Sequence, residues 1–206
     1  MKNELYKAGW EHAMDYEGYR SFIAERLAVG KTTGDKPSPS LVAISELNVH
    51  RMSRIEKTFA VDRSALDALR EVSDHAVLLT LTEGWCGDAA QILPVIEAIA
   101  KALNIESRYL LRDENDEIMD EHLTNGSRSI PIMLVLDKAS FQVIGSFGPR
   151  PSGAQAMLEE YKFQKEPKLS HTDFTKNIQL WYARDKYKST QKEIIDLLSK
   201  VLQPDA

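Results

Sequence analysis

Apolar residues recur every three or four positions in the first third of the chain. After Asp15, a residue type that is typical of helix N-caps, this spacing predicts a helix through Leu27, and it predicts a second helix over 46–59. Glycine and proline residues break the pattern at 30–40. Asp62 is expected to cap a further short helix that carries two leucines. The start of the chain is therefore predicted to be helical.

The middle of the chain alternates between strand and helix patterns. Short apolar runs predict strands at 77–81, 107–111, 132–136 and 141–144. Because only four residues separate the last two strands, we expect these two to pair antiparallel.

Three helices are predicted around these strands. The first follows Cys86, continues to Leu103 and is expected to kink at Pro94, whose ring displaces a backbone hydrogen bond. The second covers 117–123 and ends before a glycine, and the third opens with a capping-box sequence at 152–155. The predicted order is strand, helix, strand, helix, strand, strand, helix.

The C-terminal segment contains two amphipathic helices. The first is marked by a stripe of large apolar side chains, and the second opens at a capping-box sequence, 190–193. The stripe consists of Phe174, Ile178, Trp181 and Tyr182. Such a stripe needs a partner surface, which leaves two interpretations open: packing on the rest of the chain, or a homodimer interface.

Composition and charge exclude several classes of protein. The chain has 206 residues, of which 43% are hydrophobic, and a net charge of −5, which argues against nucleic-acid binding through phosphate neutralisation. No apolar run approaches the roughly 20 residues of a membrane span. Charged residues interrupt the first 14 positions, where a signal peptide would have an apolar core. We therefore expect a cytoplasmic protein without a membrane partner.

The chemistry of the chain centres on its single cysteine, Cys86. It lies in the sequence Trp-Cys-Gly-Asp-Ala, between the predicted strand 77–81 and the helix that follows. A second sulfur three residues later would allow an internal disulfide, but Ala89 occupies that position. Any redox chemistry must therefore use one thiol. Free cysteines are often buried fillers, so an inert Cys86 is the alternative.

These features together resemble a thioredoxin. The resemblance rests on Trp85-Cys86-Gly87, on Pro94 eight residues later, on the segment that ends in Pro131, and on the closing strand pair with its helix. It is closest to the larger bacterial thioredoxin-like proteins with helical extensions. It implies an α/β fold with a mixed central sheet flanked by helices: an N-terminal helical extension at 1–60, the thioredoxin-like domain at 61–166 and a C-terminal helical extension at 167–206.

The resemblance also assigns roles to individual residues. Cys86 matches the attacking thiol, Trp85 the indole beside it, and Pro131 the proline whose preceding bond is cis in thioredoxins. The backbone of Ile130 would then pair with an extended substrate. Three features depart from the family pattern, because Ala89, Asp88 and Thr80 replace the resolving cysteine, a proline and a buried aspartate.

The charges near Cys86 decide whether it is a thiolate. A helix N-terminus stabilises an anion by about 0.3–1 kcal/mol, and the Asp88 carboxylate opposes this with a repulsion of similar size. A cation such as Arg128 would favour the thiolate if it came close to the sulfur. The five histidines show no metal-ligand spacing, so we expect neither a metal nor another cofactor.

Two functions from different classes remain open. The first is monothiol thiol-disulfide exchange, in which Cys86 attacks a disulfide-containing or thiol-modified substrate and an external low-molecular-weight thiol resolves the intermediate. The second is a non-catalytic module that binds a peptide or small molecule in the groove around Trp85, Cys86 and Ile130. The joint presence of Trp85-Cys86-Gly87 and Pro131 slightly favours the first.

Overall fold

The computed structural model describes residues 2–34, 38–66, 69, 73–165 and 168–202 of the chain. Its helices are α1 (Lys2–His12), α2 (Tyr16–Ala28), α3 (Pro39–Thr58), α4 (Ala89–Leu103), α5 (Asp116–Asp120), α6 (Ser152–Phe163), α7 (His171–Asp185) and α8 (Lys188–Leu202). Its strands are β1 (Ala76–Thr82), β2 (Glu106–Leu111), β3 (Ile132–Asp137) and β4 (Val143–Phe147). Short 3-10 turns include η1 (Arg63–Ala65), η3 (Ser73–His75) and η4 (Arg112–Glu114).

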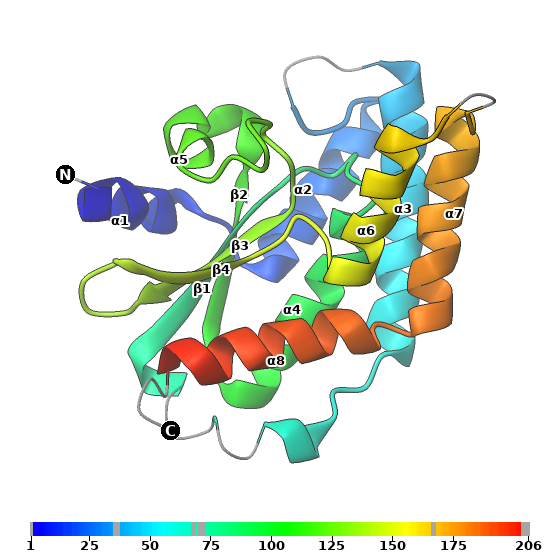
Figure 1. Cartoon of the computed structure of the whole chain (residues 1–206). Helices are drawn as coiled ribbons and strands as arrows, with labels where there is room; N and C mark the ends of the chain where they lie inside the picture. Colours follow the sequence, from blue (N-terminus) through cyan, green and yellow to red (C-terminus); the bar gives the residue numbers. More distant parts are fainter. Residues whose placement is uncertain (1, 35–37, 67–68, 70–72, 166–167, 203–206) are drawn as a thin grey trace.

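The four strands form one mixed sheet in the order β2-β1-β3-β4. β1 pairs parallel with β2 and antiparallel with β3, and β3 pairs antiparallel with β4. The predicted fold, an α/β thioredoxin-like fold with helical extensions, is therefore confirmed (Figure 1). Because β4 runs in the same direction as β1 and β2, the ends of these three strands and the start of β3 lie at one edge of the sheet.

The sheet is buried on both faces. Every residue of β1 is buried, and alternate residues belong to two different apolar clusters, as expected when side chains point to opposite sides of a strand. The first cluster joins the sheet to α4, α7 and α8 through residues such as Leu78, Ile96, Ile178 and Leu198. The second joins it to α1 and α2 through residues such as Leu79, Trp10, Tyr19 and Ile23.

The C-terminal helices are part of this core. Phe174, Ile178 and Tyr182 are buried, and α8 packs against β4 and α4. In Figure 1, α8 crosses in front of the sheet, while α6 and α7 lie side by side. The apolar stripe of α7 thus packs within the chain, and a homodimer stays a prediction.

Several element bounds differ from those predicted. Helix α1 had no clear sequence signal, and α3 begins at Pro39, where the Ser38 hydroxyl accepts the Leu41 N–H, well before the predicted start. The predicted short helix is shorter and ends at Asp120 in α5. The predicted helix after Asp62 is only the 3-10 turn η1, and part of the predicted segment lies outside the described residues.

The last strand and two helix starts also need correction. Phe141 adopts a left-handed φ of 56°, so β4 begins at Val143 instead. Ser152 is already helical, and its hydroxyl donates to Glu193 of α8 rather than capping its own helix. Thr190 lies inside α8, which begins at Lys188. Local spacing found these helices but not the long-range partners that set their ends.

No helix among the described residues combines the length and the apolar character that crossing a membrane requires.

We predict that α8 unfolds together with the sheet. Leu198 is fully buried, so Leu198→Ala should lower the free energy of unfolding by about 2–5 kcal/mol through lost contacts and the cavity left behind. Leu180→Ala, at a site that is 46% exposed on α7, serves as the control and should change it by less than about 1 kcal/mol. Urea denaturation measures both. An unchanged midpoint for Leu198→Ala would show that α8 is not part of the folded core.

Candidate functional site

The sheet edge described above carries a pocket of about 450 Å³. Its walls come from the turn after β1, from η4 after β2, from the segment before β3 and from the loop after β4. The lining residues are Trp85, Cys86, Arg112, Asp113, Ser127, Arg128, Ser129, Ile130 and Arg150. Four of the residues singled out from the sequence, Trp85, Cys86, Arg128 and Ile130, therefore meet at one pocket.

Cys86 lies in the pocket wall with little exposure. Its side chain is 8% exposed, its Sγ donates a hydrogen bond to the Ile130 carbonyl at 3.3 Å, and it accepts the Ala89 N–H at 3.4 Å. The Ile130–Pro131 peptide bond is cis. Burial, and then the nearby Asp88 carboxylate, raise the pKa of Cys86 to about 12, although N–H groups at the start of α4 oppose the shift. In this state the sulfur is a protonated, hydrogen-bonded thiol.

Asp88 lies beneath the pocket and does not line it. Its carboxylate accepts the Tyr182 hydroxyl at 3.1 Å and forms an ion pair with Arg150 at 2.6 Å, and it makes no side-chain capping bond to α4. Burial raises the pKa of Asp88, while Arg150 and Tyr182 act in the opposite direction. The Asp88 side chain therefore contacts α7 and the loop after β4 and not the N–H groups at the start of α4.

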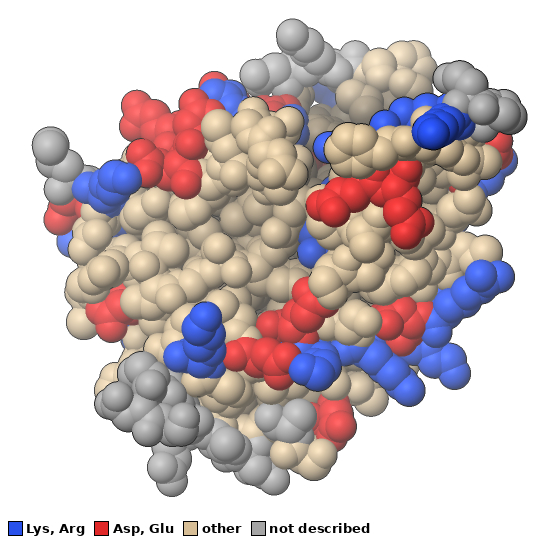
Figure 2. Space-filling view, viewed as in Figure 1, with Lys and Arg blue, Asp and Glu red and all other residues tan. Residues whose placement is uncertain are grey.

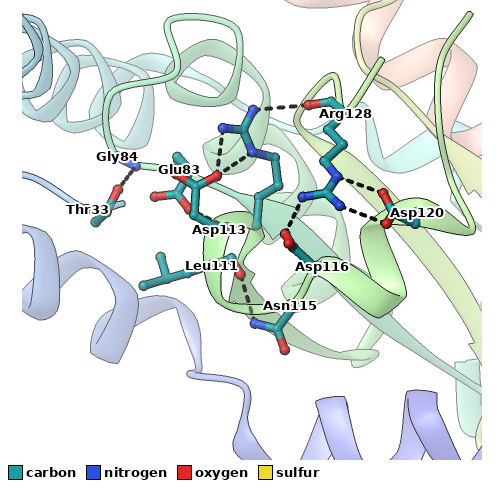
Figure 3. Close-up of polar contacts among 10 residues, drawn as sticks. Thr33, Glu83, Gly84, Leu111, Asp113, Asn115, Asp116, Asp120 and Arg128 are labelled. Carbon is teal, nitrogen blue, oxygen red and sulfur yellow. Dashed lines mark hydrogen bonds and ion pairs between the residues drawn. The ribbon is translucent and has the colours of Figure 1, made fainter. Parts of the chain in front are cut away.

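The cation that influences Cys86 is Arg150, and not Arg128. Arg128 is held by Asp120 at 2.7 Å and by Asp116, both on α5 (Figure 3). Acidic side chains gather over this part of the molecule in the space-filling view (Figure 2). Arg150 is paired with Asp88, and its charge lowers the pKa of the Cys86 thiol, but burial has the larger effect.

Arg112 closes the pocket on the side of Trp85. Its guanidinium lies 4.8 Å from the centre of the Trp85 ring, pairs with Asp113 at 2.7 Å and donates to the Arg128 carbonyl at 3.0 Å. These contacts place the guanidinium against the indole and connect η4 to the segment before β3.

Gly87 lies where the chain leaves the pocket and enters α4. A Cβ atom built on it would come 3.3 Å from the Gln179 amide nitrogen, and Gln179 also donates to the Gly87 carbonyl. The helix α7 thus packs on the turn that carries the thiol.

Glu83 is a site residue that the sequence prediction missed. It is 1% exposed, one carboxyl oxygen accepts the Asp113 N–H at 3.0 Å, and the other has no hydrogen-bond partner among the described residues. The neighbouring Thr33 hydroxyl accepts the Gly84 N–H, so the loop after α2 also contacts this turn (Figure 3). Burial raises the pKa of Glu83 to about 7. An acid placed two residues after the apolar run 77–81 was the available signal.

Among the residues that the structure describes, no three His, Cys, Asp or Glu side chains come together as ligands for a metal.

Comparison with known proteins places the chain in a family. A family model described as thioredoxin matches residues 34–162, more than half of the chain. The chain belongs to the thioredoxin family. A thioredoxin of Chlorobaculum thiosulfatiphilum is 35% identical over 80 residues, which cover 36% of this chain and 69% of that protein.

Two solved structures resemble the chain as a whole. An HIV epitope scaffold is 16% identical with a TM-score of 0.57, and the match covers 98% of each chain. A Pseudomonas aeruginosa protein of unknown function is 18% identical with a TM-score of 0.48, over 89% of this chain and 96% of that one. At these identities, the first likeness concerns the fold alone.

Within the family, the departures read from the sequence have structural consequences. Ala89 is buried, and its N–H binds the Cys86 sulfur where a second cysteine would otherwise follow. Thr80 is also buried, and its hydroxyl has no partner among the described residues. The buried carboxylates of this site, Asp88 and Glu83, instead flank Cys86 in the sequence.

We predict that Glu83 makes stability fall as the pH rises. Its folded pKa of about 7 lies above its ordinary value of 4.5, so the folded state keeps the proton longer than the unfolded state. The free energy of unfolding should therefore decrease between about pH 4.5 and 7, by about 1–3 kcal/mol. Glu83→Gln should remove this contribution, because the amide can still accept the Asp113 N–H and does not ionise.

Urea denaturation at pH 5 and at pH 8 measures the effect. Glu114→Gln, at an exposed position of the neighbouring turn η4, is the control and should keep the wild-type pH dependence. An unchanged pH dependence in Glu83→Gln would contradict the assignment.

Proposed function

We propose that this protein is a binding module on a thioredoxin scaffold, and that the pocket at Cys86 receives a peptide or small molecule while the thiol stays protonated. The observation that carries the proposal is the hydrogen bond from the Cys86 Sγ to the Ile130 carbonyl, which requires the proton on sulfur. The sulfur therefore forms part of the pocket lining and acts as a weak hydrogen-bond donor rather than as a free nucleophile.

The electrostatics of the site support this reading. With the pKa of Cys86 raised to about 12, fewer than about one thiol in 1,000 would be ionised at neutral pH. A thiolate of higher pKa is a better nucleophile, but its reactivity rises with a Brønsted coefficient of only about 0.4–0.5. The loss of thiolate therefore outweighs the gain in nucleophilicity, and exchange would be slower than for free cysteine.

The pocket itself suits a ligand of moderate size. Its volume of about 450 Å³ lies in the usual range for small-molecule sites. The indole of Trp85 and the side chain of Ile130 provide apolar surface, and serine and arginine side chains provide polar groups. The backbone of Ile130, before a cis proline, matches the position at which thioredoxins pair with an extended chain.

Monothiol exchange stays a second candidate because of one observation: Cys86 lines an open pocket beside Trp85 and Ile130, where a substrate sulfur could reach it. In this candidate, the Cys86 thiolate attacks a substrate disulfide and forms a mixed disulfide, and the other substrate sulfur leaves as a thiolate. A low-molecular-weight thiol then attacks the mixed disulfide and restores the Cys86 thiol. Binding would have to expose and deprotonate the sulfur first.

The pH dependence of Cys86 alkylation separates the two candidates. Cys86 is the only cysteine, so iodoacetamide labels one thiol. We expect a midpoint well above the value of about 8.5 for free cysteine. Asp88→Asn should lower the midpoint, because it removes a repelling carboxylate and leaves the Arg150 charge unbalanced. Asp74→Asn, at an exposed position before the opposite end of β1, should leave the midpoint unchanged.

An enzyme assay completes the test. A glutathionylated peptide with added reduced glutathione should be turned over no faster than in the presence of Cys86→Ser. Faster turnover by the wild type, together with an alkylation midpoint at or below about 8.5, would overturn the binding proposal and favour exchange.

A further inference from the structure

The pocket at Cys86 is lined by more positive than negative charge, although the chain as a whole is acidic. Arg112, Arg128 and Arg150 line it, and Asp113 is the one carboxylate among the lining residues. The whole chain has a net charge of −5. Three arginines from three different loops meet at this edge of the sheet. The pocket lining is therefore basic, in contrast to the acidic chain as a whole.

The acids that hold two of these arginines lie outside the pocket. Arg150 is anchored from beneath by Asp88, whose side chain is 10% exposed, and Arg128 is anchored by Asp116 and Asp120 on α5. None of these three acids belongs to the pocket lining. The acids fix the guanidinium groups in place and leave the pocket itself with arginine and serine donors.

Several donors at the pocket have capacity for a ligand. In the described part of the chain, the one ion pair of the Arg150 guanidinium joins a single nitrogen to Asp88, and no hydrogen bond to another residue is formed. The hydroxyls of Ser127 and Ser129 make no hydrogen bond to any described residue. Guanidinium and hydroxyl donors grouped in this way suit the oxygens of a carboxylate or a phosphate.

We propose that the ligand of this pocket carries an anionic group, a carboxylate or a phosphate, which binds to Arg150 and to the hydroxyls of Ser127 and Ser129. The apolar part of the ligand lies against Trp85 and Ile130, next to the Cys86 thiol. This inference rests on the proposed function, because it names the class of ligand for the same pocket. It requires no covalent step.

Three probes test the proposal on the full chain, of which the first two are a matched acid and amide. N-acetyl-alanyl-phenylalanine carries a carboxylate, its carboxamide is neutral, and phenyl phosphate carries a phosphate. Binding is followed by the backbone amide resonances of Ser127, Ser129 and Ile130 and by the Arg150 side-chain Nε–H resonance. We expect the dissociation constant of at least one anionic probe, measured from these shifts, to be at least about tenfold lower than that of the carboxamide. Added salt should raise the dissociation constant of the anionic probe.

Variants distinguish binding of the anion at this pocket from nonspecific electrostatic attraction to basic residues elsewhere on the surface. Ser127→Ala combined with Ser129→Ala should weaken the anionic probe by about tenfold and leave the carboxamide unaffected. Arg150→Gln should weaken binding of the anionic probe further. Lys188→Gln, at an exposed site on α8, should leave the binding of every probe unchanged.

The outcomes distinguish a failure of the anion inference from a failure of the proposed binding function. If the carboxamide saturates the same resonances as tightly as both anions, the anion inference is overturned and the binding module stands. If no probe shifts these resonances, or if the shifts persist in the serine and arginine variants, the inference is also overturned. Absence of binding by every probe would in addition count against the proposed function.

Discussion

The buried Asp88 carboxylate holds the site together. It lies one residue beyond Gly87 at the start of α4, and it binds Arg150 from the loop after β4 and Tyr182 from α7. Three parts of the chain that are distant in sequence therefore meet at one carboxylate below the pocket. Removing one partner of such a buried ion pair costs about 3–5 kcal/mol, because a charge is left without compensation. The position of the thiol and the position of the nearest cation follow from this contact.

The same contact changes what the thioredoxin scaffold can do here. A carboxylate close to Cys86 disfavours the thiolate, and burial of the sulfur adds to this effect. The protonated sulfur then donates to the Ile130 carbonyl, next to the cis peptide bond. The pocket keeps the aromatic and backbone features of the family, and arginine and serine side chains add polar groups to its lining. These features support the proposed binding module over thiol exchange.

The sequence predicted the strands and helices of the core because the apolar runs of the sheet and the spacing of α4 are local signals, and the resemblance to thioredoxins implied how they assemble into a fold. It also identified Trp85, Cys86 and Ile130, which meet at the pocket. It could not find Arg150 or Tyr182 as partners of Asp88, since these residues lie more than 60 positions away and no local pattern links them. For the same reason it named Arg128 as an example of a cation that could approach the sulfur, whereas α5 holds that side chain. The burial of Glu83 likewise depends on the loop after α2, which reaches this turn only in the folded chain.

The state of the sulfur is the central claim, and Raman spectroscopy of the S–H stretch measures it directly. The chain has one cysteine, so a single band reports on Cys86. The account predicts that this band persists at pH values above the free-cysteine pKa of about 8.5, with the lowered frequency of a hydrogen-bonded thiol. Loss of the band at or below that pH would show that Cys86 is a thiolate and would contradict the account.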